Sequence, residues 1–214
     1  MDLMNKTIIY YSGNTEESGF EANIIADLKQ KAGDIPIVSV TQIPLDLGTN
    51  ICIGRRPFSY TTEWKQVLIA LKASKTKFCI AAESDCIYPP EYFAFTPPEE
   101  KMMYNYDNIY LVWKFKNNYW RKTGSCEGAQ ICDREYWIKQ LEPLLPEKWE
   151  PYTRKEETAL VRKMFPERKK FTGNPMVTFK TRDGVSYRST FISESKTKNI
   201  PYWGDIHKLK ERFL

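Results

Sequence analysis

The sequence predicts an α/β protein, and three features carry that prediction. The chain opens with residues that favour a strand, a helix and a second strand in succession. A second helical segment is followed by an apolar run that ends in two carboxylates, Glu83 and Asp85. The last third is basic and less regular, and we expect it to add a smaller α+β part. Strands that alternate with helices indicate a mainly parallel sheet.

The first half is expected to contain three strands, two helices and a long loop, assigned from apolar runs and from apolar residues at helical spacing. The strands are expected over residues 6–11, 36–40 and 78–82, the helices over 16–31 and 60–74, and the loop over 44–54. This order predicts a Rossmann-like half. Ligands of such sheets bind outside the carboxyl ends of the strands, which is where Glu83 and Asp85 fall.

The second half shows weaker patterns. A strand is expected over 104–115, paired as a hairpin with 119–122, and Asp133 is expected to cap a helix that ends at Leu141. The remaining expected elements are a strand over 128–132, a helix over 155–164, a hairpin around Asp183-Gly184 and a basic amphipathic tail over 206–214.

Length and composition are those of one domain. The 214 residues include 42% hydrophobic and 14% aromatic side chains, enough for a substantial core. We therefore expect a single domain over 1–214. No apolar run approaches the ~18 residues of a membrane span. We expect a soluble, unprocessed, cytoplasmic protein with no membrane partner.

The cysteine pattern argues for reduced thiols. Five cysteines lie at positions 52, 79, 86, 126 and 132, and no two have the CxxC spacing. An odd number without that spacing favours a cytosolic protein over a disulfide framework. The single histidine argues against a histidine-rich zinc site.

Charge is distributed unevenly along the chain. The net charge is +5, but residues 1–150 carry 17 basic and 20 acidic side chains, whereas residues 151–214 carry 15 and 7. The two parts therefore have net charges of −3 and +8. A basic C-terminal third indicates a polyanionic partner or a phosphate-bearing ligand, although a solvated basic surface explains it equally well.

The segment Glu83-Ser84-Asp85 is the strongest candidate for a functional site. Residues two apart at a strand end share a face, so both carboxylates can point the same way. Buried carboxylates need a positive partner, and hard divalent cations prefer carboxylate oxygens. We therefore expect Mn²⁺ or Mg²⁺ carrying a phosphate group. The alternative is an exposed turn after a strand, because Glu-x-Asp occurs in many loops.

The order of elements, the acidic motif Glu83-Ser84-Asp85 and the following Tyr88-Pro89-Pro90-Glu91 together resemble the GT-A glycosyltransferases, in particular small family-2-like and phage-encoded members. The likeness covers residues 6–115 well and the remainder weakly. It implies a GT-A-like fold with a mixed sheet, a nucleotide-sugar-binding half over 1–115 and an acceptor-binding half over 116–214. It also implies transfer of a hexosyl or pentosyl group from a nucleotide sugar, with a UDP-sugar as the expected donor.

In such enzymes the acidic motif binds a metal–diphosphate group, and the end of the first strand meets the base and ribose. The resemblance therefore assigns Glu83 and Asp85 to the metal, and places Asp85 close to the reaction. A late histidine often adds a metal ligand, and His207 is the candidate here. The residues implied in donor binding are Tyr10, Tyr11, Ser12, Asn14, Asp46, Arg55, Arg56, Lys169 and Lys170.

An inverting transfer needs a base beside the acceptor hydroxyl. Glu127, Asp133 and Glu135 are the candidates. Glu127 is preferred because it lies in a glycine-containing segment, whereas Asp133 is explained as a helix cap. The sequence leaves inversion or retention, and the oligomeric state, open.

The favoured acceptor is a hydroxymethylated base in DNA. Cations and aromatic side chains interleave in the C-terminal third, and phage-type relatives include enzymes of this kind. Such a protein would act in the host cell cytoplasm and would have to extrude the base from the duplex. Three alternatives stay open: transfer to a saccharide, a nucleotidyltransferase, and a non-enzymatic DNA-binding module. A nucleotidyltransferase usually has a glycine-rich phosphate loop and a lysine near the first strand, and Ser12-Gly13-Asn14 matches this only in part.

Overall fold

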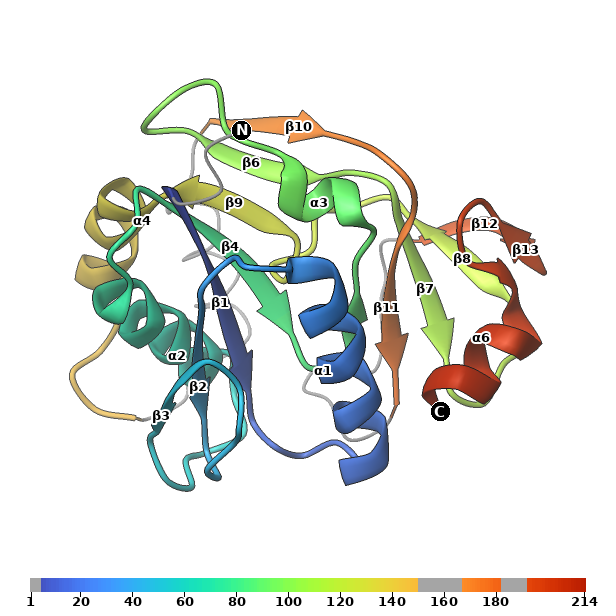
Figure 1. The fold of residues 1–214 in the computed structure, drawn as a ribbon, viewed down its shortest axis with the longest axis horizontal. Helices are drawn as coiled ribbons and strands as arrows, with labels where there is room; N and C mark the ends of the chain where they lie inside the picture. Colours follow the sequence, from blue (N-terminus) through green and yellow to red (C-terminus); the bar gives the residue numbers. More distant parts are fainter. Residues whose placement is uncertain (1–4, 150–166, 182–191) are drawn as a thin grey trace.

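The computed structural model describes residues 5–149, 167–181 and 192–214 (Figure 1). The strands of the first half are β1 (Lys6–Ser12), β2 (Ile37–Thr41), β3 (Thr49–Cys52), β4 (Phe78–Glu83), β5 (Cys86–Ile87), β6 (Met103–Tyr106) and β7 (Ile109–Trp113). Those of the second half are β8 (Tyr119–Lys122), β9 (Gln130–Asp133), β10 (Arg168–Phe171), β11 (Met176–Lys180), β12 (Ile192–Thr197), β13 (Asn199–Ile200) and β14 (Gly204–Asp205). The helices are α1 (Ser18–Ala32), α2 (Tyr60–Ala73), α3 (Pro90–Ala94), α4 (Arg134–Leu141) and α6 (Ile206–Phe213), and a short 3₁₀ helix covers Glu142–Leu144.

The main sheet has seven strands in the order β10-β6-β9-β4-β1-β2-β3. The strands β1, β2, β3 and β4 run parallel to one another. Strand β9 lies antiparallel between β4 and β6, so the sheet is mixed. The predicted α/β class with a mixed sheet is therefore confirmed, as are the first, second and third predicted strands.

Helices cover both faces of this sheet (Figure 1). Alternate residues of a strand point to opposite faces. Along β1, Ile8 and Tyr10 therefore join the core beneath α1 and α3, whereas Ile9 and Tyr11 join the core beneath α2 and α4. All four side chains are buried, which explains why the strand reads as a continuous apolar run.

A second sheet of five strands has the order β12-β8-β7-β11-β5. Its β7 and β8 form the predicted hairpin, with Tyr110 opposite Arg121. Strand β11 pairs with β7 on one side and with β5 on the other. A third core cluster, which includes Phe20, Phe179 and Phe213, joins this sheet to α1 and α6. Both sheets take strands from residues 1–115 and from residues 116–214.

Several element predictions were wrong in detail. The strand expected over 104–115 is two strands, β6 and β7, in different sheets. The expected loop over 44–54 contains the edge strand β3. The helix expected over 155–164 and the turn at Asp183-Gly184 lie outside the described residues. Within the described ranges, no helix has the length and apolar character needed to cross a membrane.

Candidate functional site

A cleft lies at the carboxyl edge of the main sheet, on the side covered by α2. Strands β1 and β4 end in it, α2 begins in it, and β11 and the β8–β9 connection contribute the opposite wall. The amide of Gln66 in α2 fixes this arrangement, because its Nε2 donates to the carbonyl of Ser12 at 2.7 Å and to that of Val40 at 2.9 Å. The middle of α2 is thereby held against the ends of β1 and β2.

Glu83 is held from several sides. The hydroxyl of Tyr11 donates to its Oε1 at 2.9 Å, and the Sγ of Cys86 lies 3.8 Å from its Oε2. The backbone of Gly128 packs so closely that a Cβ there would lie 2.5 Å from the Cδ of Glu83. Burial, and then the charge of this carboxylate, raise the pKa of the Tyr11 hydroxyl, so Tyr11 stays protonated and continues to donate. The carboxylate therefore has one fixed orientation at the end of β4.

Asp85 is paired with a lysine from the second sheet. The Nζ of Lys180 lies 2.9 Å from Oδ2 of Asp85, and the two side chains are only 12% and 15% exposed. The Sγ of Cys86 donates to the other oxygen, Oδ1, at 3.1 Å. Burial lowers the pKa of Lys180, but Asp85 and Cys86 outweigh this effect and raise it above its ordinary value. Lys180 therefore remains charged, and part of the acidic motif is neutralised from within the chain.

The cleft side chains that the structure describes carry excess negative charge. Its lining side chains include five carboxylates and two lysines: Glu16, Glu63, Glu83, Asp85, Glu127, Lys122 and Lys180. Burial, and then the charge of Asp85, raise the pKa of Glu83 to about 7. Burial, Glu83 and Asp85 raise the pKa of Glu63 well above its ordinary value. At neutral pH the cluster therefore either retains protons or attracts a cation.

This donor set fits a divalent cation. Glu83 uses Oε1 for Tyr11 and has its Oε2 3.8 Å from the sulfur of Cys86, whereas Asp85 uses Oδ2 for Lys180 and Oδ1 for the weak donor Cys86. Carboxylate oxygens that lack a full counter-charge are suitable ligands for such an ion.

The structure brings five of the predicted site residues together. Tyr11, Ser12, Glu83, Asp85 and Glu127 all line the cleft. Arg55 and Arg56 lie on the exposed loop just before the cleft residues Pro57 and Phe58. The backbone N–H of Arg56 donates to Gln42, and its guanidinium lies 4.8 Å from the ring centre of Trp149.

Three residues assigned to the donor pocket do not line the cleft. Tyr10 is fully buried beneath α1, and its hydroxyl donates to Glu21, because successive residues of β1 face opposite sides. Asn14 has a structural role, since its Oδ1 accepts the backbone N–H groups of residues 42 and 43. Asp46 is exposed near the start of β3, at the opposite edge of the sheet.

Four further residues that the sequence assigned to the site lie elsewhere on the molecule. Asp133 ends β9 at the opposite edge of the sheet and caps α4, accepting the N–H of Tyr136. Lys169 and Lys170 are exposed on the edge strand β10, where Lys169 pairs with a glutamate. His207 is exposed in the first turn of α6. None of the four is among the residues that line the cleft.

Sequence reasoning missed Lys180, Lys122 and Glu63. Lys180 reaches Asp85 from 95 positions away, through the pairing of β11 with β5, and no local pattern marks it. Glu63 had a detectable signal, because it lies in the first turn of a predicted helix that follows a strand ending at the same edge.

No protein-family model and no curated protein sequence matches the chain. Solved structures do. S. aureus TarS 1-349 in complex with UDP-GlcNAc has a TM-score of 0.53 at 14% identity, over 89% of this chain and 62% of that chain. The same TarS segment in complex with UDP has a TM-score of 0.52 at 12% identity, over 82% and 60%. The inositol-1-phosphate CTP transferase from T. maritima has a TM-score of 0.51 at 10% identity, over 98% and 96%.

The chain thus spans about three fifths of the TarS segment, and nearly the whole of the CTP transferase. At these identities the likeness shows the fold alone. The protein has a mixed α/β fold of the GT-A-like type.

Proposed function

We propose that this protein is a glycosyltransferase that uses a nucleotide sugar, with a UDP-sugar as donor. The observation that carries the proposal is the position of Glu83 and Asp85, in an acidic cleft at the carboxyl edge of a GT-A-like sheet. The structures of TarS with UDP and with UDP-GlcNAc, on a similar fold, support this choice of donor.

In this proposal Glu83 and Asp85 hold Mn²⁺ or Mg²⁺. When bound, the ion supplies positive charge that offsets the diphosphate leaving group. Tyr11 orients Glu83, and Lys180 fixes Asp85 and adds a second positive charge at the cleft wall. Arg55 and Arg56, on the loop that leads to the cleft, are the proposed contacts for the phosphates or the base.

The reaction balances as a simple substitution. The acceptor oxygen forms a bond to the anomeric carbon of the sugar, and the bond from that carbon to the diphosphate oxygen breaks. The nucleoside diphosphate leaves with the bonding electrons, and the acceptor loses its hydroxyl proton. Glu127 lines the cleft beside Glu83, and we assign it as the group that accepts this proton.

For the acceptor we propose a hydroxymethylated base in DNA, with a saccharide as the second choice. The net charge of +8 over residues 151–214 supports a polyanionic acceptor, and exposed lysines are found on β10 and β12. All five cysteines are free, which supports a cytoplasmic location. Assays with hydroxymethylated DNA, unmodified DNA and oligosaccharides separate these acceptors directly.

The donor is tested by thermal unfolding with UDP-sugars, with and without Mn²⁺. A ligand present at about 100 times its Kd adds about 2.7 kcal/mol, which raises the Tm by about 5–10 °C for a chain of this size. We expect this rise only with metal, and we expect Asp85→Asn to abolish it. Asp46→Asn, at the opposite edge of the sheet, is the matched control and should respond like the wild type. A donor response that is unchanged in Asp85→Asn would contradict the proposal, and DNA binding without any nucleotide response would favour a binding module.

A nucleotidyltransferase is the second candidate, because the T. maritima CTP transferase matches this chain over nearly its full length. Against it, the connection between β1 and α1 carries Glu16 and Glu17 where a phosphate-binding lysine would be expected. Thermal unfolding with CTP distinguishes the two functions. Stabilisation by CTP and not by UDP-sugars would select the nucleotidyltransferase.

A further inference from the structure

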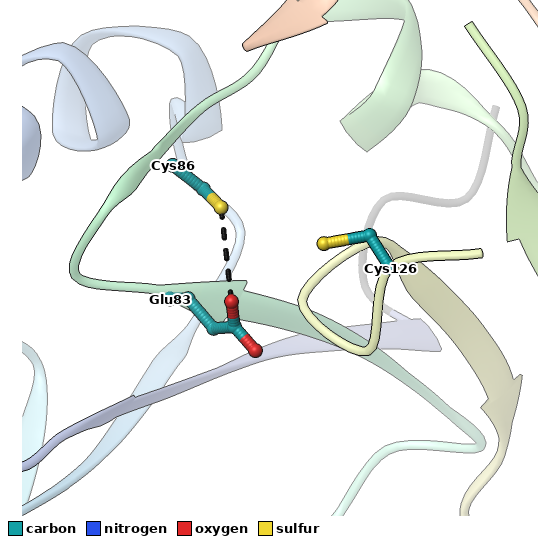
Figure 2. Close-up of side chains that lie close together, drawn as sticks. All are labelled: Glu83, Cys86 and Cys126. Atoms are coloured by element: carbon teal, nitrogen blue, oxygen red, sulfur yellow. Dashed lines mark hydrogen bonds between the residues drawn. The ribbon is translucent and has the colours of Figure 1, made fainter. Parts of the chain in front are cut away.

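Three potential metal ligands meet at the acidic motif, two from the motif region and one from a distant loop (Figure 2). They are Glu83 at the end of β4, Cys86 in β5 and Cys126 in the β8–β9 connection. The Oε2 side of Glu83 faces the sulfur of Cys86, and the sulfur of Cys126 points toward that of Cys86. The three donor atoms all lie within 4.8 Å of one another.

The spacing between the sulfur of Cys86 and the oxygen of Glu83 is close to that of a tetrahedral metal site. With zinc–sulfur and zinc–oxygen bonds of about 2.3 and 2.0 Å, a sulfur and an oxygen ligand lie about 3.5 Å apart, and two sulfurs about 3.8 Å apart. The Sγ of Cys86 lies 3.8 Å from the Oε2 of Glu83. Side-chain movements of a few tenths of an ångström therefore bring this pair to a common ion.

The fold holds these groups in place without a ligand. Tyr11 occupies Oε1 of Glu83, which leaves Oε2 toward the sulfurs. Cys86 is 1% exposed and Cys126 is 7% exposed, so both thiols are fixed in the packed interior.

A buried hydroxyl beside the same group has no hydrogen-bond partner among the described residues. Thr178 in β11 is paired with Cys86 across the second sheet, so the two side chains share a face. Its Oγ1 is fully buried and makes no hydrogen bond within the described part of the chain, and Thr178 lines the cleft. Buried hydroxyls are nearly always hydrogen-bonded. An ion-bound water molecule would satisfy it.

We infer that Glu83, Cys86 and Cys126 form a binding site for a thiophilic divalent cation, Zn²⁺ being the biological ion of this chemistry. Two sulfur ligands select zinc over the hard ions Mg²⁺ and Mn²⁺, which prefer oxygen. Three protein ligands leave a fourth position for water. On binding, both thiols lose their protons to solvent and no electron is transferred. Because Tyr11 occupies Oε1 of Glu83, only Oε2 is free, so Zn²⁺ at this site and the Mn²⁺ or Mg²⁺ of the proposed function would compete for that oxygen. The site stands on these contacts and does not depend on glycosyl transfer as the reaction.

The test uses the reduced, purified chain and the metals alone. Titration with Cd²⁺, a spectroscopic substitute for Zn²⁺, is expected to produce a thiolate-to-metal charge-transfer band that saturates at one ion per chain. Competition with Zn²⁺ should abolish the band, whereas Mg²⁺ should not. Cys86→Ser and Cys126→Ser should each weaken binding by more than about 100-fold, beyond the effect of removing an outer-shell contact. Glu83→Gln should weaken binding but keep the band, because both sulfurs remain.

The matched control is Cys52→Ser, because Cys52 is exposed in β3, apart from the three ligands. It should bind Cd²⁺ with the affinity of the wild type. Circular dichroism of each metal-free variant shows whether it is folded, and native mass spectrometry counts the ions on any variant with altered absorbance. The inference is overturned if Cd²⁺ produces no band, if Cys126→Ser binds like the wild type, or if peptide mapping finds Cys86 and Cys126 joined as a disulfide in the purified protein.

Discussion

Glu83 makes the free energy of unfolding depend on pH in a direction opposite to that of an ordinary carboxylate. Burial and the charge of Asp85 raise its pKa from 4.5 to about 7. Because the folded state binds this proton more tightly, its contribution to stability is fully present below about pH 4.5 and is lost as the pH rises through about 7. Such a shift is worth about 3 kcal/mol at pH 8.

Glu83→Gln should therefore stabilise the metal-free protein at pH 8 by about 3 kcal/mol, provided that the amide keeps the bond from Tyr11. The loss of this charge should also lower the pKa of Glu63, which is raised by burial and by Glu83. The wild type is expected to lose free energy of unfolding between about pH 5 and pH 8, and the variant to lose much less.

The assay is urea unfolding followed by tryptophan fluorescence, across that pH range and in the presence of a chelator. Asp46→Asn removes an exposed carboxylate at the opposite edge of the sheet and should follow the wild-type curve. If Glu83→Gln and the wild type lose stability in parallel, the electrostatic account of the cleft is refuted. Saturating Mn²⁺ or Zn²⁺ should remove the pH dependence of the wild type, because the cation takes the place of the proton.

Further predictions concern the supports of the cleft and of the sheet. Gly128→Ala should weaken Cd²⁺ binding at least about 10-fold, because the new Cβ would lie 2.6 Å from Oε2 of Glu83. The control Gly19→Ala has open space around it in α1 and should bind Cd²⁺ like the wild type; equal affinities of the two variants in the titration would contradict this. Lys180→Met leaves Asp85 without its partner and should lower the free energy of unfolding by about 2–4 kcal/mol, measured with urea at pH 8. The double variant with Asp85→Asn should recover most of this loss; additive losses of the two single variants would show that the pair is not coupled. Lys6→Met should lower the free energy of unfolding by about 2–3 kcal/mol, because the buried ammonium donates to the carbonyls of Phe93, Ala94 and Phe95. The control Lys75→Met, at an exposed position, should change it by less than about 0.5 kcal/mol. Gly48→Ala should cost more than about 2 kcal/mol, because its φ of 58° disfavours a side chain and the Cβ would strike the backbone of Ile37; a Tm equal to that of the wild type would contradict this.

The parallel part of the fold was predictable because its signals are local. The strands β1, β2 and β4 are buried on both faces, so their sequences are mostly apolar, and α1 and α2 show helical spacing. Strand β3 was missed because Thr49-Asn50-Ile51-Cys52 lies at the edge of the sheet, half exposed, and lacks such a run. The division of 104–115 into two strands depends on pairing with β9 and β11, which the local sequence does not encode.

The same distinction separates the site residues. Glu83 and Asp85 were found because their position follows from the end of a strand. Lys180 and Cys126 were not, because their place in the site depends on contacts between distant strands and loops. For Tyr10 and Tyr11 the signal was available: neighbours in a strand face opposite sides, so only one of the two can line a cleft on the α2 side.

The antiparallel insertion of β9 explains why one candidate base reaches the cleft and another does not. Glu127 precedes β9 and Asp133 ends it, six positions later. Glu127 lies in the turn before β9, whereas Asp133 lies at the far end of this four-residue strand. Because β9 runs against β4, it ends beside Phe78, and Gly128 just before its start lies against Glu83. A parallel β9 would have brought Asp133 to the carboxyl edge and left Glu127 at the other, so the direction of this one strand selects the carboxylate that can take part in the chemistry.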